Sequence, residues 1–141
     1  MRYAYPVDVE EAADGVTVTC PDMPEMVTDG ATRGEALERA ADALVTASSL
    51  YVEDGRPVPR PSPAHGRPVV SVTALEATKL ALHDAMLAAG ISNVELGRKL
   101  GLDEKSVRRL RDPLHRSHIG TVEAALRALG KRVEVSVMAA A

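Results

Sequence analysis

The residues best suited to chemistry in this 141-residue chain are carboxylates in its N-terminal part. They lie near the predicted ends of strands and turns, at Asp8, Glu10, Glu11, Asp14, Asp22 and Asp29. Converging carboxylates can hold two metal ions for the cleavage of a phosphodiester. Strand ends and turns are, however, where solvated acids ordinarily lie. We therefore expect no catalytic residue and no cofactor.

Histidines and the single cysteine give a weaker case for metal or thiol chemistry. His83, His115 and His118 have no cysteine in their half of the chain, and zinc sites use four protein ligands or three plus water. We therefore expect polar histidines and no metal site. Cys20 has no His or Lys beside it in the sequence to activate its thiol, which favours a small, half-buried residue.

A segment at residues 91–110 has the pattern of two short helices joined by a turn. Ser92 and Glu95 form a capping-box pair that begins the first helix, and Gly101 supplies the left-handed residue that ends it. Gly97 leaves room for a close helix crossing. The pattern predicts a helix-turn-helix whose second helix can lie in a DNA major groove. The alternative is an ordinary helical hairpin with a solvated basic face.

The second of these helices carries the residues expected to contact DNA. Arg and Lys recognise guanine, and Glu can accept a hydrogen bond from cytosine. The candidates for base contacts are Glu104, Lys105, Arg108 and Arg109. Phosphate contacts, which set affinity and register, are expected from Arg98, Lys99, Arg111, Arg116 and Ser117. One such helix is too small for a tight site, so we expect a dimer on an inverted repeat.

Charge is distributed unevenly along the chain. Residues 1–66 hold 5 basic and 12 acidic side chains, a balance of −7, and residues 67–141 hold 12 basic and 8 acidic, a balance of +4. The basic half suits nucleic acid and the acidic half suits a basic protein. The sequence has no Phe or Trp, so a core of small side chains should leave the monomer modestly stable. No leader or membrane-length apolar run is visible, so we expect no membrane partner and a cytoplasmic location.

The predicted fold class is α+β. Strands are expected at residues 2–9, 16–20 and 26–28, followed by a long helix that Thr32 and Glu35 begin and Gly55 ends. Proline-rich residues 56–68 favour a semi-rigid linker, part of which could extend as a fourth strand at residues 56–61. The expected domains are residues 1–60, a linker at 61–72, and an all-helical domain at 73–141 that Thr73 and Glu76 open with a capping box.

The C-terminal segment alternates as a strand does, over Arg132, Val133, Glu134, Val135, Ser136 and Val137. An unpaired strand can recruit a second chain. Pairing about a two-fold axis would give a homodimer, which could assemble further into a tetramer. The alternative is local pairing with the β-prone residues 69–72, and the sequence leaves both open.

Two sets of motifs resemble the HicB antitoxin family in its helix-turn-helix version. In the N-terminal half they are Tyr3-x-x-Pro6-Val7, Pro21-Asp22-Met23-Pro24, Thr28-x-Gly30-x-Thr32 and Glu35-Ala36-Leu37. In the C-terminal half they are Leu100-Gly101-Leu102, Val107-Arg108-Arg109-Leu110 and His115-Arg116-Ser117. Cys20 and Glu25-Met26 depart from the family pattern.

The resemblance implies an antitoxin whose N-terminal domain has a partial RNase H-like fold and blocks a small, basic, HicA-like mRNA-cleaving toxin. It also implies a Cro/C1-type-like domain that binds operator DNA and represses the operon. Acidic side chains could imitate RNA phosphates at the toxin's active site, and the expected toxin contacts are Asp22, Met23, Pro24, Met26, Thr28 and Asp29. The alternative function is a stand-alone transcription regulator with a ligand-sensing N-terminal domain.

Overall fold

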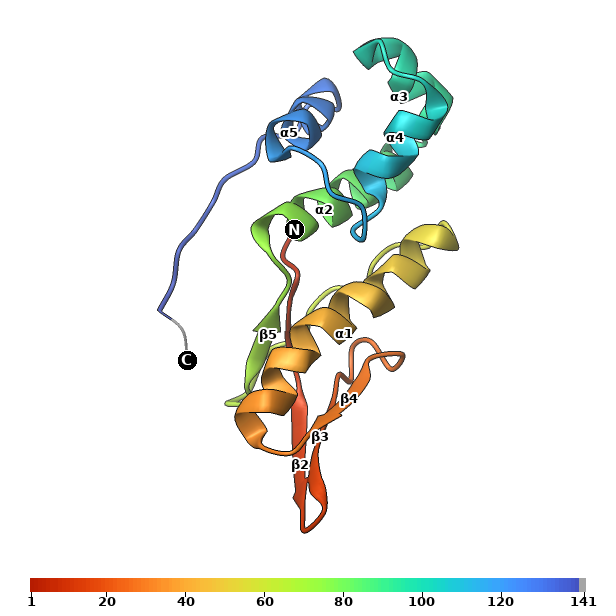
Figure 1. Cartoon of the computed structure of the whole chain (residues 1–141). Helices are drawn as coiled ribbons and strands as arrows, with labels where there is room; N and C mark the ends of the chain where they lie inside the picture. The colour runs from red at the N-terminus through yellow and green to blue at the C-terminus, as the bar shows by residue number, and fades with distance from the viewer. Residues whose placement is uncertain (140–141) are drawn as a thin grey trace. The chain divides into compact units, whose positions relative to one another are not determined.

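The computed structural model describes residues 1–139 and divides the chain into two compact units. The first consists mainly of Met1–Ser48 and Pro59–Val72, and the second of Ser49–Val58 and Thr73–Met138. Figure 1 shows the strands in the first unit and most of the helical structure in the second. The predicted α+β class is confirmed.

The first unit contains a three-stranded antiparallel sheet. β2 (Asp8–Ala12), β3 (Gly15–Thr19) and β4 (Val27–Gly30) are neighbours in chain order. A two-residue turn at residues 13–14 joins the first two strands, and period-two burial along β3 places Val16 and Val18 inside. Three strands were predicted in this part of the chain and three form the sheet, although its first strand begins at Asp8 rather than at residue 2.

The first predicted strand is split because it changes partner. β1 (Ala4–Pro6) pairs antiparallel with β5 (Val69–Ser71) in a separate two-stranded sheet. Pro6 has no N–H to donate to a ladder, and the Val7 N–H donates to the Pro68 carbonyl at 2.9 Å. The segment expected as a linker thus holds fixed contacts in the first unit, and β5 is already paired within the chain.

Residues 56–61 form no strand in the described chain, so the predicted fourth strand is wrong. Prolines at 57, 59 and 61 remove alternate backbone donors from this segment. Its order comes instead from side chains, since the Tyr5 hydroxyl donates to the Pro59 carbonyl at 2.6 Å.

The long helix α1 (Arg33–Glu53) begins close to the end of β4. The Thr32 hydroxyl accepts from the Glu35 N–H at 3.2 Å, and the Glu35 carboxylate accepts from Ala31 N–H, one residue earlier than a standard capping box. A Cβ at Gly30 would lie 2.6 Å from the Ala36 nitrogen, so only glycine permits this approach. The buried side chains of the unit include Tyr5, Val7, Val16, Val18, Cys20, Met23, Met26, Ala36, Ala40 and Leu44.

The second unit is built from four shorter helices. They are α2 (Ala74–Ala89), α3 (Asn93–Leu100), α4 (Glu104–Arg111) and α5 (Ile119–Ala128). Thr73 and Glu76 form the predicted reciprocal capping box at the start of α2. The helices pack around Leu82, Ala85, Met86, Leu96, Val107, Leu110, Val122, Ala125 and Leu126.

The C-terminal segment is extended but unpaired in the described chain. Val135 is 71% exposed and Val137 92% exposed. The predicted strand at residues 132–138 pairs with no other strand within residues 1–139. Local pairing with residues 69–72 is therefore wrong, whereas pairing between two copies stays a prediction. No helix within residues 1–139 has the length and apolarity to cross a membrane.

Candidate functional site

The turn between α3 and α4 has the local structure expected from the sequence. The Ser92 hydroxyl accepts from the Glu95 N–H at 3.1 Å, and the Glu95 carboxylate accepts from the Ser92 N–H at 3.4 Å. Gly101 ends α3 with a φ of 70°, the left-handed conformation that glycine adopts without strain. Asp103 then caps α4 by accepting from the Ser106 N–H at 2.8 Å. The sequence predictions for Ser92, Glu95 and Gly101 are confirmed.

Gly97 is required by the closeness of this turn. A Cβ at this position would lie 2.4 Å from the Leu102 carbonyl oxygen and 3.5 Å from the Val107 side chain. The Leu102 N–H also donates to the Gly97 carbonyl at 2.8 Å. The expected close approach is present, and the backbone of the turn, rather than the facing helix alone, makes it.

The outer surfaces of α3 and α4 and the loop beyond them carry a group of exposed cations. Its members are Arg98, Lys99, Lys105, Arg108, Arg109 and Arg116, which we call the basic face. All of them were expected to contact DNA. Their exposure leaves the guanidinium and ammonium groups accessible to a polyanion, and no charge in this group is used to fill the core.

Glu104 differs from the rest of the predicted base-reading set, because its carboxylate is already engaged. Arg108 donates to both carboxylate oxygens, from Nε at 3.2 Å and from Nη2 at 2.5 Å. The Asn93 amide donates to Oε1 at 3.1 Å. These hydrogen bonds hold the pKa of Glu104 below its usual value, and the bond from Arg108 has the largest effect. In the free chain Glu104 therefore orients Arg108.

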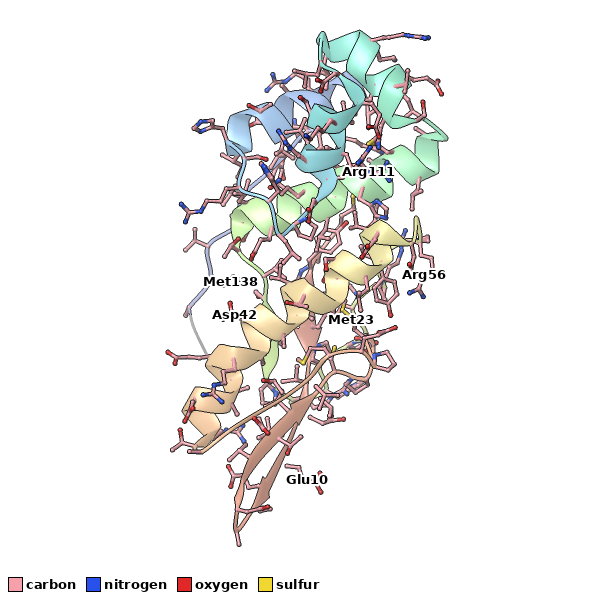
Figure 2. The ribbon with its side chains drawn as sticks, turned by 45° about the vertical axis from the view of Figure 1, so that its right-hand side comes forward. Glu10, Met23, Asp42, Arg56, Arg111 and Met138 are labelled. Carbon is pink, nitrogen blue, oxygen red and sulfur yellow. The ribbon has the colours of Figure 1, made fainter. Side chains whose placement is uncertain are left out.

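Arg111 is placed differently from what the sequence suggested (Figure 2). Its Nη1 donates to the Asn93 side-chain oxygen at 2.8 Å and its Nη2 to His83 Nδ1 at 2.7 Å. Its Nε is buried and has no hydrogen-bond partner among the described residues. Burial lowers the pKa of the guanidinium. Arg111 joins α4 to α2 and α3, and this structural role competes with the predicted phosphate contact.

Ser117 also has a partner inside the protein. Its hydroxyl accepts from Lys79 Nζ at 2.7 Å, so a structural role competes with the predicted phosphate contact. Lys79 and His83 are fully buried on α2, and sequence analysis assigned no structural role to either. A signal was present, since both interrupt the apolar face of a helix that also carries Leu82 and Met86.

The predicted toxin contacts in the first unit fall into two groups. Met23 and Met26 are fully buried, and the Ser48 hydroxyl lies 3.8 Å from Met23 Sδ. Their assignment as surface contacts is wrong, because the loop turns both side chains into the core. Pro24 is exposed, Thr28 is partly exposed, and the Asp29 side chain is 83% exposed.

Asp22 fastens the loop that precedes β4. Its carboxylate accepts from both the Ser62 N–H and the Ser62 hydroxyl, each at 2.9 Å. Asp22 is therefore half-buried and engaged, whereas the Asp29 carboxylate lies at the surface, where it pairs with Arg39 at 4.0 Å. Of the two acids expected to meet a partner, Asp29 is the accessible one.

Asp29 borders a shallow hollow of about 420 Å³, which Asp14, Glu35 and Arg39 also line. Arg39 forms an ion pair with Glu35 at 2.8 Å and donates to the Asp29 carbonyl at 3.3 Å. Across residues 1–139, no three His, Cys, Asp or Glu side chains converge to hold a metal ion. Cys20 is buried, and burial raises the pKa of its thiol, which disfavours the reactive thiolate.

Comparison with known proteins gives matches over nearly the whole chain. Residues 2–81 match the family model of the HicB_like antitoxin of bacterial toxin-antitoxin system. The chain is 41% identical to Antitoxin HicB of Pseudomonas fluorescens (strain Pf0-1), over 99% of this chain and 97% of the relative. It is 44% identical to Antitoxin HicB 2 of Photorhabdus laumondii (93% and 94%) and 37% identical to Antitoxin HicB of Escherichia coli K12 (93% and 96%).

Proposed function

Since the chain belongs to the HicB-like antitoxin family, we propose that its first unit binds and blocks a small, basic, HicA-like mRNA-cleaving toxin in the cytoplasm. The antitoxin role itself follows from the family, which is not known for catalysis, and the alternative of a stand-alone ligand-sensing regulator is not favoured. The observation that carries the toxin-blocking proposal is full-length similarity to antitoxins combined with the acidic N-terminal half. In this proposal the first unit is a partial RNase H-like fold that retains no nuclease activity.

Toxin binding is proposed for the exposed residues around Asp29. Pro24, Thr28 and Asp29 offer an accessible carboxylate beside a partly apolar loop. A carboxylate here can occupy the position of an RNA phosphate on a basic enzyme and exclude the substrate by charge complementarity. Met23 and Met26 support this loop from inside, and Asp22 ties it to Ser62.

Co-expression with the small gene that neighbours this one tests toxin blocking. The wild-type chain should rescue cells from growth arrest, and Asp29→Lys should rescue them poorly because it reverses the charge that meets the basic toxin. Asp42→Lys is the matched control, since Asp42 is also exposed but lies on α1. Equal rescue by both variants would exclude Asp29 from the interface, and failure of the wild type would refute toxin blocking.

The second unit is proposed to bind operator DNA through a helix-turn-helix made of α3 and α4. In this arrangement α4 lies in the major groove, with Lys105 and Arg109 free to reach bases. Arg108 can join them if its pair with Glu104 opens, and Arg98, Lys99 and Arg116 contact phosphates. Repression of the operon follows from occupancy of the operator.

Dimerisation through residues 132–138 is proposed to set the spacing of the two reading helices. An extended segment with exposed valines is suited to antiparallel pairing with a second copy. Val135→Lys with Val137→Lys should shift the sedimentation of the full chain toward the monomer and abolish preference for an inverted repeat. A variant that sediments as the wild type does would place the dimer contact elsewhere.

A further inference from the structure

Two buried polar side chains on α2 are directed at α4. Lys79 and His83 lie one helical turn apart, and both are fully buried. The other buried polar residue of this helix, Thr78, satisfies its hydroxyl on the Ala74 carbonyl of its own helix at 2.7 Å. Lys79 and His83 instead bond to groups of other elements, so they have a role that Thr78 does not.

Each hydrogen of the Lys79 ammonium group has an acceptor. An ammonium group has three donors, and Nζ finds three acceptors: the Arg109 carbonyl at 2.7 Å, the Asp112 carbonyl at 3.1 Å and the Ser117 hydroxyl at 2.7 Å. The two carbonyls lie at the C-terminal end of α4, where helix carbonyls lack partners in the helix and the dipole favours a cation. Burial lowers the pKa of Lys79, and the Asp112 carboxylate opposes this change.

His83 joins α4 to the segment that follows α1. The Arg111 guanidinium has no acceptor, so His83 Nδ1 must accept its hydrogen bond at 2.7 Å, and the ring proton must lie on Nε2. Nε2 then donates to the Arg56 carbonyl at 2.7 Å. Arg111 continues to Asn93, which bonds Glu104 and thereby reaches the exposed face of α4.

We propose that Lys79 and His83 are positioning residues for DNA reading, which fix the rotation and height of α4 from its buried side. The inference rests on the proposed DNA-binding function of α4. A helix of eight residues held by apolar packing alone can rotate or slide at small cost, whereas hydrogen bonds are directional. Lys79 donates a hydrogen bond to the backbone carbonyl of Arg109. The backbone of the residue best placed to contact a base is therefore held in position by a buried side chain.

The test compares binding to two DNA duplexes. One is enriched from a random pool by the full-length wild-type chain, and the other is a scrambled duplex of equal length. The ratio of the two affinities measures how well the protein recognises base sequence. An equal loss of affinity for both duplexes instead indicates a lost phosphate contact, because phosphates carry no sequence information. Lys79→Met removes the charge and keeps the length of the side chain. It should lower the ratio by about tenfold, near the low end of what loss of a base contact costs.

Two controls separate positioning from loss of charge. Lys131→Met makes the same change at an exposed position and should leave the ratio unchanged. Arg109→Ala removes the side chain proposed to read a base and should lower the ratio at least as much as Lys79→Met. An unchanged ratio in a Lys79→Met chain that keeps the wild-type circular dichroism would overturn the inference.

If Lys79→Met does not fold, a milder variant tests whether Lys79 positions α4. Ser117→Ala deletes one of the three acceptors of Lys79 and should lower the ratio by a smaller factor in the same direction. If it lowers both affinities equally, Ser117 is a phosphate contact and the inference falls. If the wild type enriches no duplex, the DNA-reading function itself fails, and positioning fails with it.

A pH profile tests His83 separately. Protonation puts a hydrogen on Nδ1 that faces the Arg111 guanidinium, so the bond is lost and two cations meet. The charged groups near the ring are Arg111 on α4 and Asp84 on α2. Burial lowers the pKa of His83 in the folded chain, so the ratio of the wild type should fall only at a pH below the ordinary histidine pKa of about 6.5. His83→Gln keeps His65, His115 and His118, and it should show no such fall; an identical profile would exclude His83.

Discussion

The two units of this chain differ in the polar groups that they bury, because within residues 1–139 only the second buries a lysine and a histidine. In the first unit Ser48 is buried, and its hydroxyl bonds to the Leu44 carbonyl of its own helix at 2.7 Å. In the second unit Lys79 and His83 are buried and connect separate elements. The first unit has a sheet whose ladders already fix its geometry. The second has two helices of eight residues, a length at which an isolated helix is only marginally stable. Directional side-chain hydrogen bonds there fix the positions of the helices, as backbone hydrogen bonds fix the strands of a sheet.

The two units also differ in where their charged side chains lie. The acids of the first unit are largely at the surface, as on β2, whereas several charged or titratable groups of the second are internal. A surface acid costs little to keep and is available to a partner. A buried Lys or His is costly unless every hydrogen bond is made, so the second unit should be sensitive to changes that the first tolerates.

The largest expected effect is in the apolar core of the first unit. Met23→Ala should lower the free energy of unfolding by about 2–5 kcal/mol, because it removes a fully buried side chain and leaves a cavity. Urea unfolding of the full chain measures this loss. Pro24→Ala, next to it but exposed, should change stability by less than about 0.5 kcal/mol. If Met23→Ala unfolds like the wild type, the loop side chain is not a core residue.

The next largest effect is expected at the turn between α3 and α4 of the second unit. Gly97→Ala should destabilise it by about 1–3 kcal/mol, because the new Cβ meets the Leu102 carbonyl oxygen at 2.4 Å. Gly120→Ala is the matched control, since a Cβ there meets nothing within 4 Å and alanine favours the helix by about 0.5–1 kcal/mol. Thermal unfolding should therefore move in opposite directions for the two variants, and a shared direction would contradict the tight turn.

The smallest expected effect is a pH dependence that belongs to the second unit. Burial, helped by the Arg111 guanidinium, lowers the pKa of His83 in the folded chain. Between the ordinary value of about 6.5 and this lower value, the unfolded chain binds a proton that the folded chain does not. Stability should therefore decrease as the pH falls through that window and then level off.

His83→Gln provides the comparison for this prediction. Without a titrating group at position 83, the decrease in stability below pH of about 6.5 should become shallower, because the lowered pKa of His83 no longer contributes to it. Urea unfolding at a series of pH values measures both slopes. Equal slopes in the two chains would show that His83 is not held neutral in the folded state.

The sequence by itself determined what depends on near neighbours. The caps at Ser92 and Thr73, the left-handed Gly101 and the small Gly97 were all predicted, because each acts on backbone groups within a few residues. The strand pattern of β3 and the acidic and basic halves were equally visible. Family membership also followed from motifs in the right order.

Only the tertiary structure determines which side chains stay at the surface and which are buried or bonded inside the protein. Met23 and Met26 lie among exposed neighbours in sequence, yet the loop turns them inward. Arg111 resembles the other basic residues of α4, yet its partners are His83 and Asn93, which are 28 and 18 residues away. Such partners are set by how helices pack, and helical periodicity does not specify which neighbouring helix covers a face. For that reason the basic face was predicted, whereas the buried bonds that hold it were not.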